Sequence, residues 1–173
     1  MSSTDGIDLP YKPGSTKYAF DEDYFQTFLQ YKQRWNPGFE FDPDWIAHLR
    51  RTNGGVPVKD WFDTPPPDVE PRGLDYMYYF KRLGATSDNS SVPRIHTLAG
   101  DSEAFHYNCI PFGQLFNGDL LCFDHRENLG GPAPVVIWLH EESQEDAPVF
   151  QYVAPNFRDF VQLLYKDEEA EAQ

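Results

Sequence analysis

The order of hydrophobic and polar residues along this chain predicts a first helix between residues 21 and 35. Apolar side chains such as Tyr24, Phe25 and Phe28 recur there at a helical spacing. Asp21 precedes them and is a candidate N-cap, because its carboxylate can accept a hydrogen bond from a free N–H of the first turn. Asn36-Pro37-Gly38 follows and ends the pattern.

A second helix is predicted to begin just after Asp42. Asp42 is a typical N-cap residue, and Pro43 suits the first helical position, where no N–H donor is needed. The apolar stripe of this helix consists of Trp45, Ile46 and Leu49. Asn53-Gly54-Gly55 is predicted to end it, because a left-handed C-cap favours Gly or Asn.

The middle of the chain gives weaker signals. Residues 63–72 contain Pro65-Pro66-Pro67 and Pro71, which predicts a stiff, extended connector. Residues 74–83 are rich in Tyr and Phe and alternate imperfectly, which favours a strand, with an amphipathic helix as the alternative. Residues 84–91 are polar and are predicted to form a loop. Residues 94–105 are compatible with either a short strand or a helical turn.

The second half of the chain predicts a series of antiparallel strands. Candidate strands lie at residues 105–111, 120–124, 135–140 and 149–153, with turns at Asn117-Gly118-Asp119 and within residues 126–132. The run Val135–Leu139 is apolar at every position, so this strand is predicted to be central and covered on both faces. Residues 141–147 form an acidic turn. Asn156, followed by Asp159, predicts a capped helix up to Leu164.

This series of elements predicts an α+β fold, in which helices pack on a mainly antiparallel sheet. At 173 residues with 40% hydrophobic side chains, the chain can form one domain with a substantial core. Aromatic residues make up 16% of the chain, and their side chains either fill such a core or contribute to an interface.

The net charge of −14 argues against direct binding of DNA or RNA, because phosphate recognition needs a basic surface. It suits a basic protein partner, although solubility alone also accounts for it. The charge is concentrated towards the end of the chain. From Asp119 to Gln173 there are twelve acidic residues and only three basic ones.

The location of the protein is predicted from the absence of targeting signals in this sequence. Residues 1–9 have no basic, then apolar, signal-peptide pattern, and no apolar run approaches the length of a membrane span. Cys109 and Cys122 are too few for a disulfide framework and are predicted to be buried free thiols. We therefore expect a cytoplasmic protein that does not bind membranes.

Catalytic and metal-binding patterns are weak in this sequence. Asp124-His125 with Ser143 or Cys122 could be drawn as a hydrolase triad, but no nucleophile motif is present, and adjacent strand residues face opposite sides of a sheet. His125 and His140 are predicted to lie near opposite ends of a strand pair, too far apart to share a metal. Neither catalytic residues, a metal nor a cofactor is therefore expected.

Two other motifs admit simpler interpretations than a ligand site. Asn53-Gly54-Gly55 lacks the lysine and the preceding strand of a phosphate-binding loop. The acidic turn at residues 141–146 lacks the spacing of a calcium loop, which leaves a solvated turn or a patch that faces a partner.

The order of five segments resembles the SUKH superfamily, which is named for Syd, a herpesvirus protein group and a yeast cell-wall-synthesis regulator. The segments are Phe41–Leu49 leading into Asn53–Pro57, then Ile110–Gly113, Asn117–Asp124, Pro134–Glu141 and Val153–Val161. The resemblance covers roughly residues 39–165. It leaves residues 1–38 as an N-terminal extension with one helix, and residues 166–173 as an acidic tail.

This resemblance implies helices packed on a mainly antiparallel sheet. It also implies an immunity protein, which binds and neutralises a cognate toxin, often a nuclease, or alternatively a regulatory scaffold like the fungal relatives. The family brings no catalytic residues. The acidic charge favours a basic, nuclease-type toxin as the partner. The expected partner-binding residues form two groups: Glu141, Glu142, Glu145 and Asp146, and Asp63, Asp68, Glu70 and Asp75.

Overall fold

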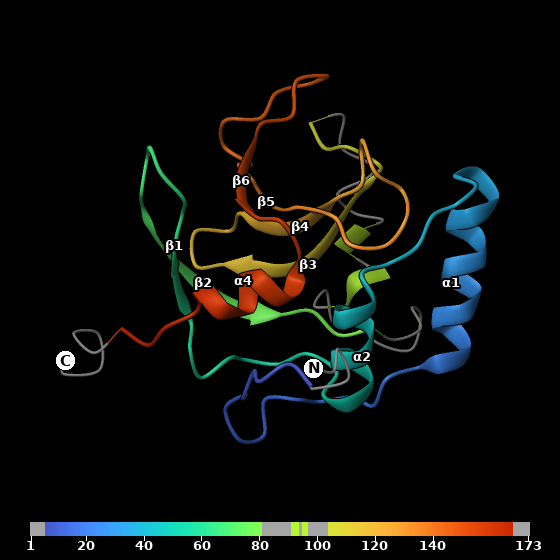
Figure 1. The fold of residues 1–173 in the computed structure, drawn as a ribbon, viewed down its shortest axis with the longest axis horizontal. Coiled ribbons are helices and arrows are strands. Elements are labelled where there is room, and N and C mark those ends of the chain that lie inside the picture. The colour runs from blue at the N-terminus through green and yellow to red at the C-terminus, as the bar shows by residue number, and fades with distance from the viewer. Residues whose placement is uncertain (1–5, 81–90, 94, 97–103, 168–173) are drawn as a thin grey trace.

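Six antiparallel strands form one sheet in sequence order, as Figure 1 shows for the computed structural model of this chain. The structure describes residues 6–80, 91–93, 95–96 and 104–167. The strands are β1 (Trp61–Asp63), β2 (Pro71–Met77), β3 (Cys109–Leu115), β4 (Leu120–Asp124), β5 (Val135–Trp138) and β6 (Phe150–Ala154). Each strand pairs with the next one along the chain.

The sheet is strongly curled. Arg72 of β2 donates a hydrogen bond of 3.1 Å to the side-chain oxygen of Gln151 on β6. In a flat sheet these two strands would lie about 19 Å apart, because three others separate them. Only a curled sheet lets the two side chains meet.

Three helices with side-chain caps lie within the described residues: α1 (Glu22–Trp35), α2 (Pro43–Arg51) and α4 (Phe157–Leu163). Asp21 accepts a hydrogen bond from the N–H of Tyr24, Asp42 from that of Asp44, and Asn156 from that of Asp159. These are the three caps that the sequence predicted. Helices packed on an antiparallel sheet confirm the predicted α+β class.

An aromatic core joins α2 and α4 to one face of the sheet. The rings of Phe112 on β3 and Phe123 on β4 are stacked at 4.3 Å, and Trp45 of α2 lies 4.9 Å from Phe123. From α4, Phe157 and Phe160 contact Phe112 at 6.0 and 5.7 Å. All five side chains are almost completely buried, so this cluster is the centre of the molecule.

The opposite face of the sheet is covered near β5. Trp138 donates a hydrogen bond of 2.7 Å to the carbonyl oxygen of Ala104, and its ring lies 5.1 Å from Phe105. Val135, Val136 and Ile137 are buried, which confirms that β5 is covered on both faces. The predicted central position of this strand is wrong, because β3 and β4 are central and β5 lies next to the edge strand β6.

The proline-rich stretch is not a connector between separate parts of the fold. Residues 64–70 form the loop of the β1–β2 hairpin, and β2 begins at Pro71, three residues before the predicted start. Proline is tolerated there because it is the first residue of the strand. The strand prediction for this region is confirmed for Leu74–Met77, and the helix alternative is wrong. Residues 81–90 of the predicted strand and loop lie outside the described residues.

The predicted strand at residues 105–111 begins later in the structure, at Cys109. His106 ends the preceding segment in a turn, because its ring accepts a hydrogen bond from the N–H of Asn108 and its carbonyl oxygen accepts one from Cys109. Within the ambiguous segment 94–105, Ile95 and His96 lie in a helical turn. Cys109 and Cys122 are buried and free, as predicted.

The predicted glycine C-cap of α2 is also wrong. The helix ends at Arg51 with Thr52 in an extended conformation, and Asn53-Gly54-Gly55 pairs with the continuation of β2 instead. Asn53 exchanges two hydrogen bonds with the backbone of Phe80, of 3.1 and 2.8 Å. A Cβ atom on Gly54 would lie 2.8 Å from the carbonyl oxygen of Met77. Gly54 therefore permits close contact between two backbones.

Lys32 of α1 is completely buried against a segment that lies far away in the sequence. Its ammonium group lies 3.7 Å from the centre of the Tyr107 ring, 3.3 Å from the Tyr107 carbonyl oxygen and 3.5 Å from His96 Nε2. Burial lowers the pKa of Lys32 to about 8, because desolvation penalises the charged form.

We expect the stability difference between the wild-type protein and Lys32→Met to depend on pH. Between pH 8 and 10.5 the unfolded state holds the Lys32 proton that the folded state has released, so wild-type stability rises relative to the variant by about 3 kcal/mol. Urea unfolding at pH 7, 8, 9 and 10 measures this difference. Lys12→Met, at an exposed position, is the control, and a difference that does not vary with pH would contradict the prediction.

Candidate functional site

Three loops of the meander lie at the same end of the sheet. In an antiparallel meander, every second connection lies at the same end of the sheet. The connections at residues 63–70, 116–119 and 139–149 therefore share one end. Figure 1 shows the β1–β2 and β5–β6 connections at this end. We call this region the acidic end. Its three loops contain no lysine or arginine and eight carboxylates: Asp63, Asp68, Glu70, Asp119, Glu141, Glu142, Glu145 and Asp146.

A polar network holds the three loops together. Asp119 in the β3–β4 turn accepts hydrogen bonds from the backbone N–H of His140, at 3.1 Å, and from the His140 ring, at 2.5 Å. Arg72 at the start of β2 lies 3.7 Å from the same carboxylate and also 3.7 Å from the carboxylate of Glu70 in the β1–β2 loop. Asp119 is buried, and the Arg72 side chain is only 15% exposed, so solvent screens this network weakly. The network fixes the loops relative to one another.

The β5–β6 loop, which carries the first predicted group, is ordered by Ser143. The Ser143 hydroxyl donates to the carbonyl oxygen of Leu139 and accepts from the N–H of Val149, both at 2.8 Å. Gln144 and Ala147 pair across the tip of the loop. Glu141, Glu142, Glu145 and Asp146 are all exposed, and the Glu141 side chain is 87% exposed.

The second predicted group is divided by the structure. Thr64 closes the β1–β2 loop through hydrogen bonds with Asp68 and Glu70, and both of these acids are exposed. Asp63 accepts a hydrogen bond of 2.8 Å from the Tyr165 hydroxyl, which raises the pKa of Tyr165 to about 12. Asp75 lies apart from the loops, in the bulge of β2, where partial burial raises its pKa.

An exposed aromatic side chain at the acidic end was missed by the sequence analysis. Phe116 in the β3–β4 turn is 57% exposed and lies 6.0 Å from Trp61. It rests on Gly73, where a Cβ atom would lie 2.1 Å from its ring. Aromatic side chains, phenylalanine included, are enriched at protein interfaces. No local signal identifies Phe116, since the sequence alone does not show which side of the turn is solvated.

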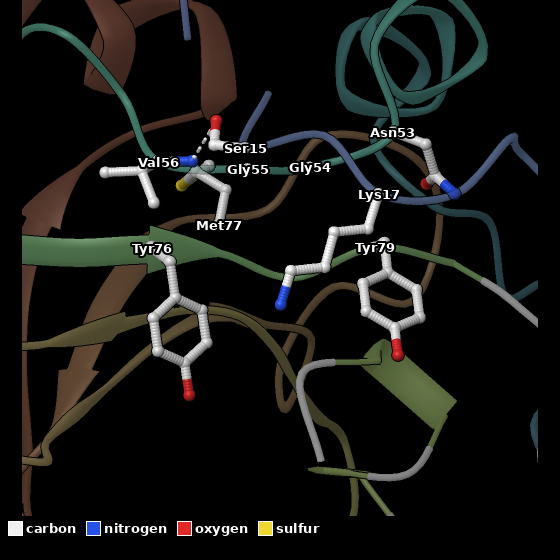
Figure 2. Close-up of a pocket in the computed structure, with 9 residues that line it drawn as sticks. All are labelled: Ser15, Lys17, Asn53, Gly54, Gly55, Val56, Tyr76, Met77 and Tyr79. Atoms are coloured by element: carbon white, nitrogen blue, oxygen red, sulfur yellow. Dashed lines mark hydrogen bonds between the residues drawn. The ribbon is translucent and has the colours of Figure 1, made fainter. Parts of the chain in front are cut away.

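A separate pocket lies near the other end of β2. It encloses about 200 Å³ between residues 15–17, the Asn53–Val56 turn and Tyr76, Met77 and Tyr79. Figure 2 shows the Lys17 side chain extending into the space between the two tyrosine rings. Its lining residues include none of the predicted partner-binding positions.

Comparison with protein-family models gives one match, to the SMI1/KNR4 family (SUKH-1), over residues 26–163. The match extends over most of the chain and spans all the strands and helices described here except the first turn of α1. The chain belongs to the SMI1/KNR4 family (SUKH-1). Comparison with curated proteins and with solved structures gave no significant match.

Membership of SUKH-1 confirms the resemblance drawn from the sequence. The family match begins within α1, before the boundary predicted after residue 38. Phe25 of α1 contacts Phe41 and Phe80 of the same core, at 5.6 and 5.4 Å. The three-part division at residues 38 and 165 stays a prediction, and residues 168–173 of the acidic tail lie outside the described residues.

The histidines of this SUKH-1 domain are held by the fold in separate environments. His125 is buried, and its Nδ1 lies 3.0 Å from the carbonyl oxygen of Asn128, whereas His140 binds Asp119 at the acidic end. Asp124, which would orient His125 in a triad, instead pairs with Arg126 at 2.8 Å. Within the described ranges no group of three His, Cys, Asp or Glu residues could hold a metal ion.

Ser143 and Cys122, the other residues considered for a triad, have structural roles. Ser143 is occupied by backbone groups of its own loop, and the Cys122 thiol is buried within the sheet, where burial raises its pKa well above the usual value. None of the helices in the described part of the chain is long and apolar enough to cross a membrane.

Proposed function

We propose that this SUKH-1 protein is an immunity protein, which binds and neutralises a cognate basic toxin of the nuclease type by stoichiometric protein–protein interaction. The acidic end is the docking surface, and the protein acts without catalysis from the cytoplasm. The observation that carries this proposal is that the strand order brings seven exposed carboxylates and the exposed ring of Phe116 to one end of the sheet, in three loops without lysine or arginine.

The physical basis of the proposal is electrostatic complementarity. A nuclease surface that binds phosphate groups is basic, so an acidic surface of matching shape attracts it and competes with nucleic acid. The network of Arg72, Asp119 and His140 holds the loops in place before binding, which reduces the entropy lost on association. Phe116 supplies an apolar contact among the charges.

A rescue experiment tests this function directly. The tagged protein is recovered from its native cells at low and moderate salt, and each partner that co-purifies is expressed alone and together with it. A basic partner that stops growth alone, and does not when the SUKH-1 protein is present, would establish the proposal. If only endogenous cell-wall or signalling proteins co-purify, the regulatory scaffold related to the fungal members becomes the better proposal.

We expect charge reversal at the acidic end to slow association with the toxin. Glu141→Lys combined with Glu142→Lys removes attraction on the approach path, and the association rate should fall roughly tenfold or more at low salt and much less at high salt. Stopped-flow or surface-based kinetics at two salt concentrations measures the effect.

The matched control reverses two exposed acids elsewhere, Glu40 and Glu127. Glu127 lies on the β4–β5 loop, at the opposite end of the sheet, and the change in net charge is the same. Equal slowing by both double variants would mean that net charge alone matters, and the acidic end would lose its assigned role.

A further inference from the structure

The pocket between residues 15–17 and the Asn53–Val56 turn has no part in the proposed docking surface. Its cationic wall comes from an N-terminal segment, residues 9–18, which lies outside the family match at residues 26–163. We call this segment the strap. Ser15 and Lys17 of the strap line one side of this pocket, which is partly open to solvent.

The strap is fastened to the domain by hydrogen bonds along its length. The N–H of Lys12 donates to the carbonyl oxygen of Val56 at 2.8 Å, and the N–H of Val56 donates to Ser15 Oγ at 3.0 Å. Thr16 donates to the carbonyl oxygen of Gly54 at 2.7 Å. The strap also holds Tyr11 against His48 of α2, at 2.7 Å. The pocket is therefore a formed feature of this fold.

The walls of the pocket are mainly apolar. Val56, Met77 and the rings of Tyr76 and Tyr79 line it. The Tyr76 hydroxyl donates to Gln114 at 3.0 Å, and the Tyr79 ring lies 4.4 Å from the Tyr18 ring, so both rings have fixed orientations. Flat aromatic walls suit a flat or apolar ligand body.

Lys17 supplies the only charge among the nine described lining residues. Within the described part of the chain Lys17 makes no ion pair, and in Figure 2 its ammonium group points into the space between Tyr76 and Tyr79. The whole protein carries a net charge of −14. Against this negative background, the unpaired ammonium group of Lys17 would favour an anionic ligand in the pocket. A carboxylate would gain a charge-assisted hydrogen bond from Lys17.

The size of the pocket limits the ligand. A volume of about 200 Å³ is below the roughly 300 Å³ at which pockets for drug-sized molecules begin. At roughly 30 Å³ for each water molecule it equals the space of about seven waters. A ligand smaller than a drug-sized molecule therefore suits it.

We propose that this pocket binds a small monocarboxylic acid with a flat apolar body. The carboxylate pairs with Lys17, and the apolar body lies between Tyr76 and Tyr79. Binding pins the strap to the domain, because the ligand contacts both sides of the pocket. The site differs from the acidic end in charge and position, so its occupancy is separable from toxin binding.

The test uses three probes of similar shape on the full-length protein: benzoate, benzamide and benzylamine. Titration of each probe is followed by amide chemical shifts. We expect benzoate to shift the amides of Gly54, Gly55 and Met77 saturably, with a dissociation constant of roughly 0.1–10 mM. Neutral benzamide should bind about tenfold more weakly, and cationic benzylamine should not bind measurably.

Two variants assign the contribution of Lys17. Lys17→Met keeps most of the side-chain length and removes the charge, and it should reduce benzoate affinity to that of benzamide. Lys12→Met, at an exposed position on the same strap outside the pocket lining, should leave affinity unchanged. No saturable shift with benzoate, equal affinity in Lys17→Met, or shifts centred on the acidic end would each overturn the proposal.

Discussion

Phe112→Ala is expected to lower the free energy of unfolding by about 3–5 kcal/mol, which is the cost of removing a fully buried aromatic ring from a packed core. Phe112 is completely buried and contacts aromatic rings from the sheet and from both α2 and α4, namely Trp45, Phe123, Phe157 and Phe160. No single neighbouring element can move to fill the space. Urea unfolding followed by tryptophan fluorescence measures the loss.

Phe116→Ala is the matched control, because it deletes the same ring four residues away, where the side chain is 57% exposed. Its cost should stay below about 1 kcal/mol. If the two variants lose similar stability, Phe112 does not stand at the centre of the core. Phe116→Ala also tests the proposed function, since it should weaken binding of the proposed toxin at the acidic end at little cost in stability.

Acid is expected to unfold this protein between about pH 4 and 5, because buried neutral histidines oppose protonation. Burial lowers the pKa of His48 to about 4, of His125 to about 4 and of His96 to about 3. As pH falls from 6.5, these three histidines bind protons in the unfolded state, whereas in the folded state they stay mostly neutral until the pH approaches their lowered pKa values. By pH 4 the summed loss is on the order of 10 kcal/mol, which matches the whole stability of a typical domain.

His48→Gln tests the origin of this acid sensitivity. The His48 ring shares a hydrogen bond of 2.7 Å with the Tyr11 hydroxyl, and glutamine offers an oxygen to the same donor without titrating. The slope of unfolding free energy against pH between 6 and 4 should decrease by about one proton. An unchanged slope in His48→Gln would place the acid sensitivity in other groups, such as the Asp124 carboxylate, whose pKa is lowered beside Arg126.

Much of the secondary structure is determined by short stretches of this sequence. Each predicted N-cap is a side chain that bonds an N–H group two or three residues away, so Asp21, Asp42 and Asn156 act where the sequence places them. The hairpin between β4 and β5 follows from local turn residues, and Asp124 and Val135 flank its loop as predicted. The resemblance to the SUKH superfamily also rests on short motifs, and the family match confirms it.

The wrong predictions arise where a distant segment overrides a local preference. Gly54 and Gly55 are typical of a helix cap, but in the structure Gly55 pairs with Met77 at the end of β2. The prolines at residues 65–67 look like a connector, but Thr64 and the pairing of β1 with β2 bend them into a hairpin loop. Neither partner lies within a short sequence window, so local periodicity could not reveal it.

The sequence by itself determined the α+β class, the helix N-caps, most of the strands and the acidic composition of two separate loops. Only the tertiary structure decided that these loops share one end of the sheet with Phe116, and that Arg72, Asp119 and His140 join them. It also placed Lys17 beside Tyr76 and Tyr79. The physical reason is the distance along the sequence over which each interaction acts. Caps and turns are bonds between near neighbours, whereas a binding surface depends on strand register and sheet curl, which long-range packing sets.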